Sequence, residues 1–134
     1  MKNCVYRFLN KDNEVIYIGR AKDLKSRLSG HRHLPLDCYK HIYQVQYTTF
    51  EDENTLDFVE CYFIQKYKPI YNSKFNNGEK VFRIEELDKK RWKFYKDFAK
   101  HINISTLENI KATEDAESVS RRKLVDIASS NFII

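Results

Sequence analysis

The amino-terminal third of the chain shows a pattern of apolar and polar positions that predicts strands. Residues 4–9 (CVYRFL) and 14–18 (EVIYI) are rich in β-branched and aromatic side chains, and the turn-forming segment 10–13 (NKDN) separates them. These segments therefore predict a β-hairpin, which ends at Gly19. Residues 41–48 (HIYQVQYT) alternate apolar and polar side chains and predict a third strand.

Helical periodicity appears between and after these strands. Leu24 and Leu28 are four residues apart and a glycine follows them, which predicts a helix over residues 21–29. A second helix is predicted to begin at residue 50 and to end before Pro69, because the residue that precedes a proline disfavours helical geometry. Its predicted buried stripe consists of Leu56, Val59, Phe63 and Ile64.

The carboxy-terminal part of the chain differs in its pattern and is rich in charged residues. It predicts a short strand at 81–84, a charged amphipathic helix at 85–102 and a last helix at 114–129. We therefore expect an α/β fold of the α+β kind, in which a small, three-stranded, mainly antiparallel sheet is flanked by helices. The sheet belongs to a core of residues 1–78, and residues 79–134 form a helical extension packed on that core.

Composition narrows the class of protein. The 134 residues are 42% hydrophobic and 14% aromatic, which excludes a disordered chain. We expect no membrane span and no signal peptide, because the apolar stretches are short and no cleavage site is visible near the amino terminus. The three cysteines are an odd number and lie far apart, so we expect reduced thiols and a cytoplasmic protein.

The placement of charge indicates more than the net charge of +5, which merely permits a polyanionic partner. Six basic residues lie between positions 20 and 40, whereas residues 51–60 hold five acids and no base. A site that hydrolyses a phosphodiester needs both kinds of charge. The basic residues can bind the phosphate, and the acidic residues can bind a metal ion.

Several polar side chains stand in an ordered pattern on these predicted elements. The pattern is Cys4-Val5-Tyr6, Tyr17-Ile18-Gly19, Arg27 and His31 one helical turn apart, Glu60 on the second predicted helix, and Asn72. It resembles the GIY-YIG nuclease family over about residues 3–75. Cysteine and valine replace the glycine and isoleucine of the family's first tripeptide, but the tyrosine, whose hydroxyl is the chemically relevant group, is kept.

The resemblance implies a divalent-metal-dependent endonuclease that hydrolyses phosphodiester bonds of DNA and uses Mg²⁺ or Mn²⁺. Within the family, it is compatible with a homing-type or phage nuclease, a restriction-like enzyme, or a repair or junction-processing nuclease. An enzyme that cuts both strands alone needs two sites, and a homodimer is the simplest way to provide them. The catalytic residues that it implies are Tyr6, Tyr17, Arg27, His31, Glu60 and Asn72.

The chemistry of these side chains agrees with that reaction. Arg27 can hold two phosphate oxygens at once and stays protonated at working pH. Glu60 is a hard oxygen ligand, and a single carboxylate is typical of a Mg²⁺ ion that keeps several of its waters. Tyr6 is our predicted base for the attacking water, with Tyr17 orienting the water or the phosphate, although the two roles can be exchanged.

The remaining positions are expected to assist. His31 can hydrogen-bond a phosphate oxygen or relay a proton, and Asn72, as the resemblance implies, supports the end of the second helix and the outer shell of the metal. Gly19 lets the backbone pass close to the site. We predict contacts to DNA from Gly19, Arg20, Lys22, Lys25 and Arg32.

Other interpretations remain open at this point. His31, His33, Cys38 and His41 suggest a zinc site, but their spacing matches no common structural zinc module. A non-catalytic DNA-binding module on the same fold would bind DNA without cutting it. A plain structural or protein-interaction domain would show no salt-dependent affinity for DNA. Residues 79–134 can recognise DNA, dimerise or cap the sheet.

Overall fold

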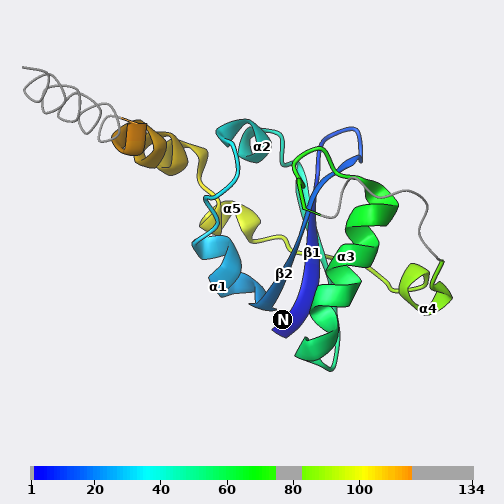
Figure 1. Cartoon of the computed structure of the whole chain (residues 1–134). Helices are drawn as coiled ribbons and strands as arrows, with labels where there is room; N and C mark the ends of the chain where they lie inside the picture. Colours follow the sequence, from blue (N-terminus) through cyan, green and yellow to red (C-terminus); the bar gives the residue numbers. More distant parts are fainter. Residues whose placement is uncertain (1, 75–82, 116–134) are drawn as a thin grey trace, which may run out of the picture. The chain divides into compact units, whose positions relative to one another are not determined.

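The computed structural model describes residues 2–74 and 83–115 of the chain (Figure 1). The chain consists of two compact units, Met1–Ile102 and Asn103–Ile134. In the first unit, four antiparallel strands form one sheet in the order β2-β1-β3-β4. The strands are β1 (Lys2–Leu9), β2 (Val15–Asp23), β3 (Gln44–Thr49) and β4 (Lys93–Phe94).

The predicted hairpin is confirmed, and its second strand is longer than expected. β2 continues past Gly19 as far as Asp23, because Asp23 still pairs with Lys2 at the start of β1. The predicted helix at 21–29 therefore shortens to α1 (Leu24–Ser29). Asp23 caps that helix, since its carboxylate accepts a hydrogen bond of 3.1 Å from the backbone N–H of Ser26.

Helices lie on both sides of the sheet, with α1 and α2 (Leu36–Lys40) on one side and α3 (Leu56–Tyr67) on the other (Figure 1). A single 3₁₀ turn, η1 (Glu53–Thr55), precedes α3. At its other end, α3 is capped by Lys68, which has a left-handed conformation and precedes Pro69. The predicted buried stripe of α3 is confirmed. Its members pack in one cluster with side chains of β1 and β2, namely Val5, Ile18, Leu56, Val59, Tyr62, Phe63 and Ile64.

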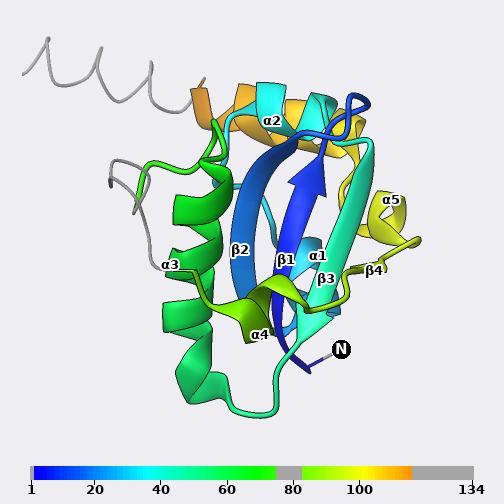
Figure 2. The same ribbon diagram turned by 90° about the vertical axis from the view of Figure 1, so that its right-hand side faces the viewer.

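The predicted helix at 85–102 is wrong. The segment instead forms a short helix α4 (Glu85–Asp88), the strand β4, and a short helix α5 (Phe98–His101), and Figure 2 shows β4 beside β3. Long-range contacts override the local periodicity here. β4 pairs with β3, and Trp92 packs against Phe63 with ring centroids 5.1 Å apart.

The sheet therefore has four strands rather than the three predicted. The division of the chain at residue 78 stays a prediction, although β4, which lies beyond that boundary, completes the sheet of the first unit. Residues 83–84 of the predicted strand 81–84 are not a strand, and the other two lie outside the described residues.

In the second unit, residues 104–115 are helical. The side chain of Asn103 accepts a hydrogen bond of 3.1 Å from the backbone N–H of Thr106 and so caps the beginning of this helix. Most of the predicted helix at 114–129 lies outside the described residues. No helix in the described ranges is long and apolar enough to cross a membrane.

Candidate active site

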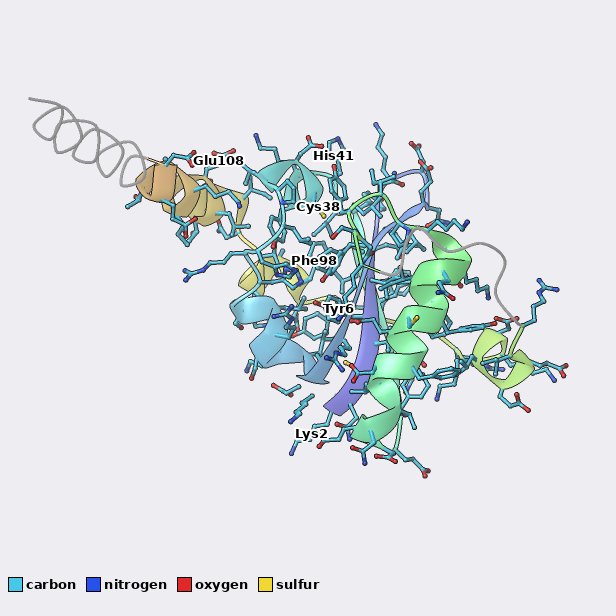
Figure 3. All side chains as sticks on the ribbon, in the orientation of Figure 1. Lys2, Tyr6, Cys38, His41, Phe98 and Glu108 are labelled. Carbon is cyan, nitrogen blue, oxygen red and sulfur yellow. The ribbon has the colours of Figure 1, made fainter. Side chains whose placement is uncertain are left out.

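A close approach between β1 and β2 sets the position of Tyr6, which lies on the side of the sheet that faces α1 (Figure 3). Tyr6 is fully buried and stands opposite Gly19 in the register of the two strands. A Cβ atom at position 19 would lie 2.4 Å from both Cζ and Oη of Tyr6. The glycine is thus required because the phenol ring occupies the space of a side chain. That Gly19 also contacts DNA stays a prediction.

Replacing Gly19 by alanine is expected to displace the Tyr6 ring. The added methyl group overlaps a buried ring, so we expect the free energy of unfolding to fall by about 1–3 kcal/mol and the site to lose its geometry. Thermal unfolding measures the stability. Gly30→Ala is the matched control, because the nearest atom to its new Cβ lies 4.0 Å away. Equal melting temperatures for the two variants would contradict this account of Gly19.

The Tyr6 hydroxyl is the centre of a hydrogen-bond chain. It lies 2.8 Å from Nε2 of His31 and accepts a hydrogen bond of 3.3 Å from Nε of Arg27. His31 is 3% exposed, and its Nδ1 lies 2.8 Å from the hydroxyl of Tyr39, a residue of α2. The Tyr39 hydroxyl in turn accepts a hydrogen bond of 3.2 Å from the backbone N–H of Leu34. These hydrogen bonds hold Tyr6, His31 and Arg27 together. That they act in one catalytic site stays a prediction.

Tyr17 lies beside this chain on β2. Its ring centroid is 6.1 Å from that of Tyr6 and 5.5 Å from that of His31. Its hydroxyl lies 3.2 Å from Nε2 of His33, an exposed residue in the loop between α1 and α2. Two phenols and two imidazoles therefore gather on the side of the sheet that carries α1 and α2.

Burial controls the protonation of these groups. It raises the pKa of Tyr6 well above its usual value, and the neighbouring Tyr17 adds to this increase. Burial also raises the pKa of Tyr17, whereas the positive charge of Arg27 lowers it. For His31, burial is the main cause that lowers the pKa to about 3, so the ring is neutral near pH 7.

Glu60 of α3 interacts electrostatically with Tyr17 of this group. Burial raises the pKa of its half-buried carboxyl, while the charges of Arg20, Lys74 and Arg27 lower it. The negative charge of Glu60 contributes in turn to the raised pKa of Tyr17. The charges of Glu60 on α3 and Arg27 on α1 thus both act on the pKa of Tyr17 on β2. That these three residues form one catalytic site stays a prediction.

Asn72 is placed by the edge of β2. Its side-chain oxygen accepts a hydrogen bond of 2.9 Å from the backbone N–H of Ile18, and its amide nitrogen donates one of 2.9 Å to the carbonyl of Ile18. The backbone N–H of Tyr71 donates to the carbonyl of Ile16 at 3.1 Å. Asn72 therefore fixes the strand between Tyr17 and Gly19, and its contribution to a metal's outer shell stays a prediction.

The basic residues predicted to contact DNA differ in their surroundings. Arg20 forms an ion pair with Asp57 of α3, and the ammonium of Lys22 lies 3.7 Å from the carboxylate of Glu53. Lys25 and Arg32 are exposed. Acidic neighbours thus offset part of the positive charge of the first two residues, which the sequence pattern did not indicate. The contacts to DNA stay a prediction for all four.

The zinc interpretation is not supported. In the part of the chain that the structure describes, no three His, Cys, Asp or Glu side chains are grouped to hold a metal ion. Both ring nitrogens of His31 face phenols, and Nδ1 of His41 lies 2.7 Å from the carbonyl oxygen of Asp37.

Tyr39, which contacts His31, is a residue that the sequence analysis missed, because nothing in its spacing along the chain marks it.

The chain is similar to one known family. The family model of the UvrC-like GIY-YIG domain matches residues 2–73. UvrABC system protein C of Mycoplasma capricolum is 37% identical over 79 residues, which cover 55% of the chain and 14% of that relative. The protein of the same name from Methanosphaera stadtmanae is 28% identical over 97% of the chain and 22% of its own length. The chain therefore spans less than a quarter of these relatives.

Two solved structures also align with part of the chain. The GIY-YIG N-terminal endonuclease domain of UvrC from Thermotoga maritima, bound to its catalytic magnesium, aligns with 53% of the chain and 83% of its own length. The sequence identity is 28% and the TM-score is 0.47. The Y43F variant of that domain aligns with 55% of the chain and 84% of its own length, at 27% identity and a TM-score of 0.48.

Proposed function

The chain belongs to the UvrC-like GIY-YIG domain family, and on this premise we propose that it is an endonuclease that hydrolyses DNA phosphodiester bonds with the help of a divalent metal ion. The observation that carries the proposal is the hydrogen-bonded group in which Arg27 donates to the Tyr6 hydroxyl, with the Tyr17 ring beside it. The negative charge of Glu60 on α3 and the positive charge of Arg27 both act on the pKa of Tyr17. Such a group combines the charges that a phosphodiester requires with groups that can handle a proton.

Arg27 supplies the charge that makes phosphorus accessible to attack. A phosphodiester is shielded by its own negative charge, so an attacking water needs a cation at the phosphate oxygens. The guanidinium lies at the surface end of the hydrogen-bond chain, with Nε on the Tyr6 hydroxyl. Its terminal nitrogens can then donate to the phosphate in a bidentate manner.

Glu60 fits the role of a ligand for Mg²⁺ or Mn²⁺. It is a half-buried carboxyl whose pKa burial raises, and a cation beside it would restore the charged form. A single carboxylate agrees with a Mg²⁺ ion that retains most of its waters. When bound, such an ion supplies positive charge to the phosphate and the leaving oxygen.

The structure favours exchanging the two roles that the sequence analysis gave to Tyr6 and Tyr17. Tyr6 is fully buried, and its partner His31, with a pKa of about 3, cannot hold a further proton near neutral pH. Tyr17 is 8% exposed and its partner His33 is exposed. We therefore assign the base to Tyr17 and give Tyr6 the role of orienting Arg27, rather than the reverse assignment made from the sequence.

The test is cleavage of DNA by the whole chain. Supercoiled plasmid and branched duplexes are incubated with Mg²⁺, with Mn²⁺ or with EDTA, and the cut ends are mapped. We expect cleavage with either ion and none with EDTA. A repair or junction-processing role is also consistent with the similarity to UvrABC system proteins, and cleavage of the branched duplexes tests it. Binding without cleavage in both ions would favour the non-catalytic module, and cleavage that persists in EDTA would exclude the metal.

A further inference from the structure

The two phenols of the site each face a histidine, and the two pairs differ in their access to solvent. The Tyr6 hydroxyl lies 2.8 Å from Nε2 of His31, and the Tyr17 hydroxyl lies 3.2 Å from Nε2 of His33. The two imidazole rings lie 4.7 Å apart with an angle of 33° between their planes. His31 is 3% exposed, whereas His33 is exposed.

From this geometry we propose that His33 is the terminal proton acceptor of the reaction, which takes the hydroxyl proton of Tyr17 while Tyr17 takes a proton from the attacking water. The inference rests on the proposed function. The loop after α1 then has two functions. It places His31 beside Tyr6, and it provides His33 as the acceptor of the Tyr17 proton.

The proton and electron balance of the step is simple. As the water oxygen forms its bond to phosphorus, a water proton moves to Oη of Tyr17, and the original hydroxyl proton moves to Nε2 of His33. The bond from phosphorus to the leaving sugar oxygen breaks, and that oxygen takes a proton from solvent water. His33 then returns its proton to solvent, so Tyr17 and His33 end each turnover in their starting states.

Tyr17 needs such an acceptor because a phenol is a poor base while it keeps its own proton. Burial raises the pKa of Tyr17 above its usual value, and the charge of Glu60 adds to this, so the phenolate is scarce near pH 7. Passing the proton onward lets Tyr17 act without becoming a free phenolate. The hydrogen bond to Nε2 of His33 provides the path.

His33 rather than His31 can accept this proton. Both ring nitrogens of His31 face buried phenols, Tyr6 and Tyr39, and burial lowers the pKa of His31 to about 3. His33 is exposed and can exchange its proton with solvent. When the neutral ring carries its proton on Nδ1, the Nε2 atom can accept the hydrogen bond from Tyr17.

The test compares His33→Ala with the wild type under single-turnover conditions and saturating Mg²⁺. We expect the cleavage rate to fall by about 10²-fold and the DNA affinity to stay the same. Imidazole added to the buffer should restore part of the rate of His33→Ala and none of the rate of Glu60→Gln. His41→Ala is the matched control, because His41 is an exposed histidine with its Nδ1 on the Asp37 carbonyl.

A second measurement needs no cleavage. In the ¹⁵N spectrum of the free chain, Tyr17→Phe should change the Nε2 shift of His33, because it removes the hydrogen bond, while Tyr47→Phe should not. Wild-type rates for His33→Ala, no rescue by imidazole, or an unchanged Nε2 shift would overturn this inference alone. A wild-type chain that cleaves no DNA in either metal would overturn the proposed function as well.

Discussion

Replacing Glu60 by glutamine is expected to abolish cleavage and to leave DNA binding nearly unchanged. Glutamine keeps the size and shape of the side chain but removes the charge that holds the divalent cation. We expect the single-turnover rate to fall by about 10³-fold or more, since the charge stabilisation supplied by the ion disappears. Fluorescence anisotropy of a labelled duplex measures the affinity separately from the rate.

The stability of the same variant separates lost chemistry from lost structure. Burial raises the pKa of Glu60, so the folded chain holds this proton more tightly than the unfolded chain, and the charged carboxylate weakens the fold as the pH rises through that pKa. Glu60→Gln should therefore melt at the same or a higher temperature at pH 7. Glu53→Gln, an exposed glutamate paired with Lys22, is the control and should cleave normally. Wild-type turnover by Glu60→Gln would remove Glu60 from the metal site.

Replacing Arg27 by alanine is expected to reduce the cleavage rate by about 10²-fold or more, as does the loss of one charge-stabilising donor in other enzymes. The reason is twofold. The phosphate loses its guanidinium, and the Tyr6 hydroxyl loses the hydrogen bond that Nε of Arg27 donates at 3.3 Å. Rates at saturating enzyme measure the effect on the chemical step.

Two further variants test the specificity of that effect. Arg27→Lys should restore only part of the rate, because an ammonium lacks the planar fork that holds two oxygens. Lys25→Ala removes an exposed positive charge from the same helix, so it should weaken DNA binding slightly and leave the rate at saturation unchanged. If Arg27→Ala and Lys25→Ala have the same small effect, Arg27 contributes only to general attraction of DNA.

Local patterns were sufficient to predict the hairpin and the buried stripe of α3, although α3 begins at Leu56 rather than at residue 50 as predicted. In the hairpin, β-branched and aromatic residues flank a turn in which the side chain of Asn10 accepts hydrogen bonds of 3.0 Å from the backbone N–H groups of Asp12 and Glu14. In α3, the stripe at helical spacing is the buried face. Both features depend on residues that are close in sequence, which is why periodicity alone identifies them.

Long-range contacts decided the elements that the sequence did not reveal. β4 has only two residues and forms because Gln46 and Tyr47 of β3 pair with it. Next to it, the Arg7 guanidinium lies 4.1 Å from the ring centroid of Trp92. No property of residues 85–102 by themselves indicates that β3 and β1 will provide these partners, so the helical pattern was misleading.

The composition of the site was predictable in part. The family pattern marked the phenols, Arg27 and Glu60 as candidates, and the structure places Arg27 on the Tyr6 hydroxyl with the Tyr17 ring beside it. The family pattern did not identify Tyr39 or the role that we propose for His33. Their contacts depend on how the loop between α1 and α2 folds back on the sheet. The ion pair of Arg20 with Asp57 was equally hidden, because it joins β2 to a helix that follows a third strand.

The central claim is that one site holds a divalent cation at Glu60, beside Arg27 and Tyr17. Crystals of the chain grown with Mn²⁺ allow the ion to be located by its anomalous scattering. The account predicts a peak roughly 2.0–2.2 Å from a carboxylate oxygen of Glu60, with the guanidinium of Arg27 directed to the same space. Manganese peaks at other acidic residues and none at Glu60 would contradict it.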